Sequence, residues 1–164
     1  MTFEDAVKAH GAELFRFAYW LARDRHRAED VVQEALLRSW RGFGGLQDPG
    51  AVKSWMYSIV RNEYYRMIGA EGPRTDSLDD DAGEIADPRA TLFGLEMRDA
   101  IQALPAALAE PLALQVLGGF SCAEIASMLE TTEGAVMTRL TRARQALRRL
   151  VTPAESRGRK GDRS

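Results

Sequence analysis

Hydrophobic side chains recur every three or four residues through the first part of the chain, which is the period of amphipathic helices. The pattern predicts two helices within residues 3–41, separated by a polar break at residues 24–27. A stretch rich in glycine at residues 42–50 is typical of a turn and precedes a third helix at about residues 51–68. The tryptophans expected on the apolar faces of these helices are Trp40 and Trp55.

The helical pattern stops after residue 68 and resumes at residue 91. The segment between holds three Gly, two Pro and few large apolar residues, so it cannot bury enough surface to offset its ordering entropy. The helices expected beyond it cover about residues 91–104, 109–117, 122–129 and 133–151. The sequence therefore predicts an all-α protein of two small helical domains, residues 1–68 and 91–152, joined by a flexible linker at 69–90 and followed by a disordered basic tail at 153–164.

Charge is unevenly distributed, although the net charge is only −2. Residues 70–90 carry seven acids against two Arg, whereas residues 134–151 carry five Arg and no acid. A protein that meets phosphate needs positive charge on the contacting face and not along the whole chain. The total charge therefore does not exclude a nucleic-acid binder.

Other compositional features point to a soluble, cytosolic protein. The apolar runs are far shorter than the roughly 20 residues of a membrane span, and the start lacks the apolar core of a signal peptide. With Cys122 as its one cysteine, the chain has no internal disulfide framework. His10 and His26 lack partners at metal-ligand spacing, so we expect neither a metal nor a cofactor.

The strongest local motif is a helix-turn-helix at residues 119–140. Ser121 and Glu124 have the spacing of a capping box, and Thr132 is the expected N-cap of the next helix. The apolar residues expected between the two helices are Ile125, Leu129, Val136 and Leu140. Such a pair presents its second helix to a DNA major groove, although a purely structural helix pair with a solvated basic end is an alternative.

Both halves of the chain resemble one protein family. Residues 28–41 and 54–62 resemble the first conserved domain of sigma-70-family factors of the extracytoplasmic-function (ECF) group. The segments that resemble the group's fourth region are residues 104–114, 119–126 and 134–147. The resemblance covers about residues 10–68 and 92–151 in the family's order and spacing. It implies a transcription initiation factor, not itself an enzyme, that directs core RNA polymerase to promoter DNA.

The resemblance implies a surface for the polymerase on the second predicted helix. Its residues, which match the family's contact with the β′ clamp helices, are Asp30, Gln33, Glu34 and Arg38. Their spacing suits a polar docking strip, and a solvated helix face with i,i+4 pairs is the alternative. The resemblance further implies the polymerase β flap and an anti-sigma factor as partners. No small-molecule substrate is expected.

The third predicted helix matches the family's surface for the −10 promoter element, where flipped bases need stacking surfaces and polar groups beside positive charge. The residues that supply such groups are Tyr57, Arg61, Asn62, Tyr65 and Arg66. Trp55 and Tyr64 are expected in the core instead.

The last predicted helix matches the family's reader of the −35 element. Its candidate DNA contacts are Met137, Thr138, Arg139, Thr141, Arg142 and Arg144. We expect Thr138 and Arg142 to contact bases and Arg139 and Arg144 to bind phosphates. The family usually has Lys or Arg at Met137 and commonly Gly at Glu130, so binding to the −35 element is expected to be weaker or differently specific.

Several interpretations remain open at this point. The acidic linker either threads the RNA exit path of the polymerase, as the resemblance implies, or is a solvated spacer. The basic tail either supports DNA binding or is solubilising. Instead of a sigma factor, the chain could be a sigma-like regulator that binds only an anti-sigma factor, or a helix-turn-helix repressor.

Overall fold

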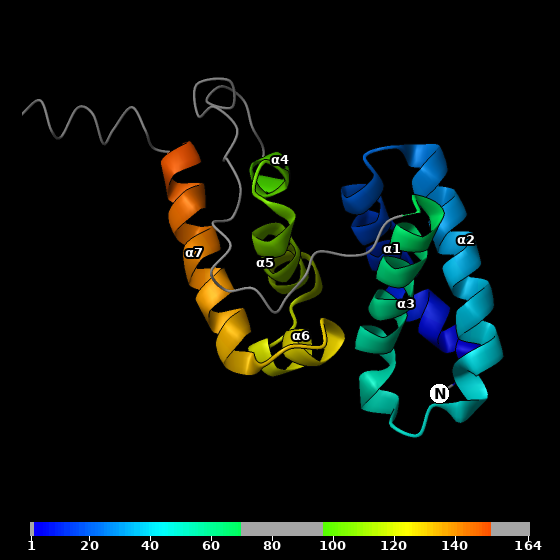
Figure 1. The fold of residues 1–164 in the computed structure, drawn as a ribbon. Helices are drawn as coiled ribbons and strands as arrows, with labels where there is room; N and C mark the ends of the chain where they lie inside the picture. The colour runs from blue at the N-terminus through cyan, green and yellow to red at the C-terminus, as the bar shows by residue number, and fades with distance from the viewer. Residues whose placement is uncertain (1, 70–96, 152–164) are drawn as a thin grey trace, which may run out of the picture.

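In a computed structural model, the described part of the chain, residues 2–69 and 97–151, consists of helices and the turns between them, without strands (Figure 1). The first unit consists of α1 (Phe3–Ala22), α2 (Arg25–Gly42) and α3 (Val52–Met67), with two short 3-10 helices, η1 (Phe43–Gly45) and η2 (Pro49–Ala51), between α2 and α3. The second unit consists of α4 (Met97–Gln102), α5 (Ala106–Gly118), α6 (Cys122–Met128) and α7 (Glu133–Val151). The all-α fold class is confirmed. The predicted linker and basic tail lie outside the described residues, apart from Gly69.

The polar break expected at residues 24–27 is shorter than predicted. Arg23 adopts the left-handed conformation at φ 55° and ends α1. The Asp24 carboxylate accepts a hydrogen bond from the His26 amide at 3.0 Å, so α2 already begins at Arg25. An Asp N-cap of this kind satisfies a helix-start amide, and the polar residues behind it form the first helical turn.

The two predicted tryptophan positions differ in outcome. Trp55 is partly buried against the core, where its ring lies close to Gly42. Trp40 is 64% exposed, so the expectation that it faces the core is wrong. Only a narrow stripe of α2 is buried, the residues being Ala28, Val31, Ala35 and Ser39. Trp40 lies outside that stripe because its neighbour Ser39 takes the inward position.

Helix α5 starts three residues earlier than the sequence predicts. The carbonyl of Pro105 accepts hydrogen bonds from the amides of Leu108 and Ala109 at 2.9 and 2.8 Å, which closes the first turn at Ala106. The helix continues through Pro111 and is buried on almost every side. A helix that is apolar all round needs partners on more than one face.

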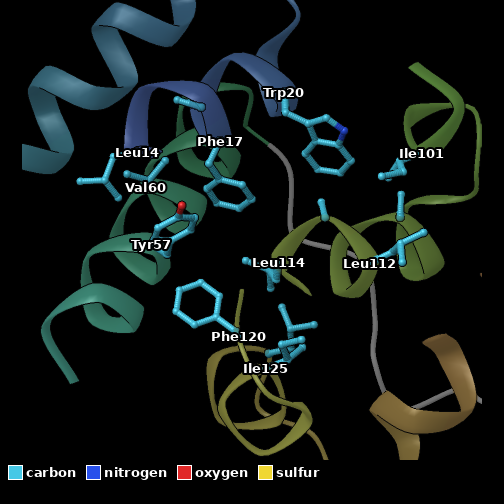
Figure 2. Packing of buried hydrophobic residues seen from close by; sticks show 14 of the residues in the cluster. Leu14, Phe17, Trp20, Tyr57, Val60, Ile101, Leu112, Leu114, Phe120 and Ile125 are labelled. Atoms are coloured by element: carbon cyan, nitrogen blue, oxygen red, sulfur yellow. The ribbon is translucent and has the colours of Figure 1, made fainter. Parts of the chain in front are cut away.

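Helix α5 finds those partners in both units. It stands between α7 and α1, as Figure 1 shows, and contacts both. The buried apolar residues form one continuous cluster across the two units, and Figure 2 shows Tyr57 and Phe17 facing Leu114 and Phe120. The ring of Phe120 meets Tyr57 edge-on, with 4.9 Å between centroids. The two helical units therefore share a core in this structure.

None of the helices in residues 2–69 and 97–151 combines the length and the apolar character that crossing a membrane requires.

Candidate protein and nucleic-acid interfaces

The helix-turn-helix forms through the caps that the sequence predicts. Ser121 Oγ accepts from the Glu124 amide at 3.2 Å, and Glu124 Oε1 accepts from the Ser121 amide at 3.0 Å. Thr132 Oγ1 accepts from the Ala135 amide at 3.1 Å and starts α7. Glu130, in the turn, has φ 54°, which is the left-handed region where glycine is favoured. This conformation is the physical reason for the glycine that the family commonly has there.

One face of α7 is open to solvent. Met137, Thr138, Thr141 and Arg142 are all exposed on it. The hydroxyls of Thr138 and Thr141 donate to the carbonyls of Gly134 and Met137, each at 3.0 Å, so their oxygens remain available as acceptors. Arg144 is exposed as well, but one of its Nη atoms donates to Gln115 of α5. The solvent-exposed side chains of the predicted −35 surface lie on this face.

Arg139 does not belong to that face. Its residue exposure is 3%, so the prediction that it anchors a phosphate is wrong for this conformation. The reason is helical register: Ala135 and Ala143, four residues before and after it, are buried too. Because alanine side chains are short, two alanines at those positions leave room for a long side chain on the inward face. This spacing could have identified Arg139 as a buried residue from the sequence.

The predicted polymerase strip on α2 is only partly free. Asp30 and Gln33 are exposed, and Glu34 is half-buried. Arg38 Nε lies 2.7 Å from Glu63 Oε2 of α3, an acid that is itself buried. Arg38 thus forms an ion pair within the first unit, and Glu63 is a residue that the sequence analysis missed.

Beside that strip lies an apolar depression of about 410 Å³. Its lining residues are Phe3, Gln33, Leu36, Leu37 and Trp40. Trp40 is 64% exposed and Leu37 is 49% exposed. Large exposed apolar side chains rimmed by polar groups are typical of a protein interface.

The predicted −10 residues of α3 fall into three groups. Asn62 and Arg66 are exposed, and Arg66 Nη1 lies 3.8 Å from Glu63 Oε2. Tyr57 is fully buried between Phe17 and Phe120, so the prediction that it contacts a base is wrong for this conformation. Burial raises the pKa of the Tyr57 hydroxyl well above its ordinary value. A fully buried ring cannot stack on a flipped base.

Arg61 and Tyr65 converge on Glu110 of α5. Arg61 Nε lies 2.9 Å from Glu110 Oε2, and the Tyr65 hydroxyl donates to the other carboxylate oxygen. The side chains of Arg61 and Glu110 are only 13% and 2% exposed. Burial raises the pKa of Glu110 despite the opposing effects of Arg61 and Tyr65, and burial together with Glu110 raises the pKa of Tyr65.

Sequence reasoning missed Glu110, and a signal for it was present. Glu110 is the one charged residue of the apolar stretch 103–118. An acid in such a stretch is seldom buried without a cationic or hydrogen-bonding partner. The pattern could therefore have indicated a partner elsewhere in the chain, but not which residue it is.

Comparison with known proteins accounts for both units. The family model described as Sigma-70 region 2 matches residues 6–73, and the one described as Sigma-70, region 4 matches residues 94–147. The ECF RNA polymerase sigma factor SigM of Mycobacterium tuberculosis is 32% identical over 151 residues, which cover 91% of this chain and 76% of SigM. The ECF RNA polymerase sigma factor SigE of Mycolicibacterium smegmatis is 29% identical over 156 residues, and this chain spans 60% of its length.

A solved structure extends the similarity to the fold. The sigma factor RpoE from Bartonella quintana, in complex with the anti-sigma factor NepR, has 27% sequence identity and a TM-score of 0.70. The alignment covers 90% of this chain and 95% of the RpoE chain. The order of the two matched regions, the identity to SigM and this shared fold agree, and the chain belongs to the ECF group of the sigma-70 family of RNA polymerase sigma factors.

Proposed function

We propose that this chain binds core RNA polymerase and directs it to specific promoters, without catalysing a reaction itself. The observation that carries the proposal is the exposed face of α7 with Thr138, Thr141 and Arg142, presented by a helix-turn-helix within a chain that matches both sigma regions in order. Exposed Arg142 and the acceptor oxygens of Thr138 and Thr141 supply the groups that read base edges in a major groove. This face is proposed to bind the −35 element.

The proposed polymerase surface lies on α2. Exposed Trp40 and Leu37 supply apolar anchors, and Gln33, Asp30 and Glu34 supply a polar rim. Interfaces commonly combine a buried aromatic anchor with polar surroundings, and such anchors contribute much of the binding energy. A helical partner such as the β′ clamp fits a surface that runs along one helix. Binding to core polymerase would place the chain in the cytoplasm, where polymerase works.

The proposed −10 surface is the part of α3 that carries Asn62, Arg66, Arg61 and Tyr65. The first two are exposed, whereas the last two contact Glu110 of the second unit. We therefore propose that Arg61 and Tyr65 reach promoter DNA only after the units have separated. RpoE of Bartonella quintana was solved with an anti-sigma factor, and we propose a partner of that class here.

The test is reconstituted transcription. The purified chain is mixed with core polymerase and a fragmented genomic library, and run-off transcripts are sequenced. Transcripts that start at defined positions only when the chain is present support the proposal. Polymerase binding without such transcripts contradicts the proposal and favours a regulator that binds other proteins. Duplex binding without any polymerase binding contradicts it in favour of a repressor.

A further inference from the structure

The first two turns of α7 differ in charge from the rest of its exposed face. Arg139 is the one cation of residues 130–141, and it is buried. The acids Glu130 and Glu133 are exposed there, whereas the exposed cations of the helix begin at Arg142. A recognition helix places its first residues against base edges, and binding to the DNA backbone needs positive charge at the contact. The start of α7 therefore lacks charged side chains for the backbone but has the position of a base reader.

The hydroxyls of Thr138 and Thr141 are both used within the helix. They donate to the carbonyls of Gly134 and Met137, each at 3.0 Å. Because a hydroxyl has one proton, neither side chain in this arrangement can donate a hydrogen bond to a purine N7 or to a carbonyl oxygen of a base. Each threonine thus offers a partner only an acceptor oxygen and a methyl group.

Met137 extends this methyl-bearing surface. It is 56% exposed, and Thr141 lies one turn further along the same side of the helix. Thr138 and Thr141 have i,i+3 spacing, so all three side chains are neighbours on the helix surface. Methionine is common at binding surfaces because its unbranched thioether adapts to the shape of a partner. Met137 and the methyl groups of Thr138 and Thr141 therefore form an exposed apolar cluster, the methyl cluster.

Gly134 allows a partner to approach the methyl cluster closely. It is exposed in the first turn of α7, at i−3 from Met137 and i−4 from Thr138. A Cβ added at Gly134 would meet nothing outside its own helical turn within 4 Å, so the space over it is open. No side chain at this position holds the start of the helix away from the floor of a groove.

An apolar cluster in a major groove meets one complementary group. Thymine carries a 5-methyl group at its major-groove edge, and no other unmodified base presents an apolar group there. The adenine paired with thymine presents an amino group, which a threonine oxygen can accept. An A·T base pair therefore matches both the methyl groups and the acceptor oxygens at the start of α7.

We propose that Met137, with the methyl groups of Thr138 and Thr141, selects thymine in the −35 element. The proposal rests on the proposed function, because it takes α7 as the reader of that element. An apolar contact with a base edge discriminates between sequences, whereas a cation on a phosphate contributes affinity for any sequence. The start of α7 thus contributes sequence specificity, and the arginines that follow contribute charge.

Replacing thymine by uracil tests the methyl contact alone, because uracil keeps every hydrogen-bonding group of thymine and lacks only the 5-methyl group. The run-off assay supplies promoters, and block substitutions locate the −35 element in them. Each thymine of that element is replaced singly by uracil in a synthetic promoter. Binding of the chain in complex with core polymerase is then measured by competition against the unmodified promoter.

We expect at least one replacement to weaken binding by about fourfold, the factor that corresponds to one buried methyl group. Equal binding at every replaced position overturns the proposal. So does a −35 element that contains no thymine in either strand.

Variants of Met137 distinguish a contact by this side chain from an effect of uracil on the DNA itself. Met137→Leu stays apolar and should keep most of the thymine preference. Met137→Gln, which is similar in length but polar, should remove it. Val116→Gln is the matched control, since Val116 is an exposed apolar residue of α5, and should leave the preference unchanged. A preference that persists in Met137→Gln overturns the proposal.

Met137→Lys separates the apolar contact from charge and provides a second test should Met137→Gln fail to fold, which thermal unfolding followed by circular dichroism detects. We expect Met137→Lys to bind duplex DNA of any sequence more tightly, with a steeper salt dependence, because it adds a phosphate contact. It should bind thymine and uracil promoters equally. A gain in affinity with the thymine preference intact overturns the proposal.

The run-off assay distinguishes this failure from failure of the proposed function. If the chain with core polymerase yields defined transcripts but no replacement of thymine alters binding, the sigma factor assignment stands and thymine selection is wrong. If no defined transcripts appear, the proposed function fails and thymine selection fails with it.

Discussion

At the scale of single residues, the same residue type has different fates on neighbouring turns of one helix. Arg142 is exposed on α7, whereas Arg139 lies on the buried face of the same helix, with Ala135 and Ala143. Charge alone does not separate these arginines, because both lie in the acid-free segment 134–151. The faces they occupy do separate them.

Arg142→Ala and Arg139→Ala are therefore expected to have different effects. Arg142→Ala should reduce initiation at promoters that depend on a −35 element and leave polymerase affinity unchanged, because it removes a group from the exposed face. Arg139→Ala should lower the free energy of unfolding by about 1–3 kcal/mol, as is usual for the loss of a buried side chain. Run-off transcription on promoter variants and thermal unfolding measure the two effects. Equal loss at every promoter sequence would show that Arg142 binds only phosphate.

Trp40 is the residue on which the proposed polymerase surface depends. Trp40→Ala should weaken binding to core polymerase by about 2 kcal/mol or more, as the loss of a central aromatic anchor does. Val116→Ala is the matched control, because Val116 is an exposed apolar residue of the second unit. Affinity is measured by titrating labelled chain with core polymerase. Equal affinities of the two variants would place the polymerase surface elsewhere.

At the scale of elements, local sequence signals determined the helices well. The capping boxes at Thr2 and Ser121 and the cap at Thr132 depend on residues three positions apart, so they form whatever the rest of the chain does. The early starts of α2 and α5 were missed because residues 24–27 were expected to form a polar break, and because no helix was expected at residues 105–108. Both errors concern boundaries and not the existence of the helices.

The turn between α6 and α7 carries a testable strain. Glu130 has φ 54°, a conformation that costs a side-chain-bearing residue about 1–2 kcal/mol. Glu130→Gly should raise the free energy of unfolding by about 0.5–1 kcal/mol, after the greater entropy of glycine in the unfolded chain is subtracted. Glu130→Ala, which removes the charge but keeps the strain, is the control. If chemical denaturation shows equal gains for both variants, charge rather than backbone strain determines the stability of this turn.

At the scale of the whole molecule, the shared core between units is the feature with the greatest functional consequence. It buries Tyr57 and engages Arg61 and Tyr65, all of which the resemblance assigned to promoter DNA. The exposed face of α7 stays accessible in the same conformation. The structure therefore separates the two proposed DNA surfaces into one that is open and one that is covered.

The contact between the two units should depend on pH through Glu110. Burial raises the pKa of the Glu110 carboxyl in this structure, where the two units are in contact. This arrangement therefore binds a proton more tightly than one in which Glu110 is exposed. The bound proton stabilises the contact between the units fully at pH values below the ordinary carboxyl pKa. This stabilisation is lost as the pH rises through the raised pKa of Glu110. The distance between a label on each unit should therefore lengthen as the pH rises above the ordinary range of a carboxyl pKa. Glu110→Gln should abolish this dependence, and a dependence that persists in Glu110→Gln would assign it to another group.

The sequence by itself determined the helical fold, the order of the two units, the helix-turn-helix and the family, because these depend on spacings of a few residues and on local caps. Only the tertiary structure decided which of the assigned side chains are accessible. Arg61 and Glu110 are 49 positions apart, and no periodicity along either helix encodes their meeting. Whether two side chains so far apart in the sequence meet, and so become inaccessible, depends on how the whole faces of α3 and α5 pack. The shapes of both units together determine that packing.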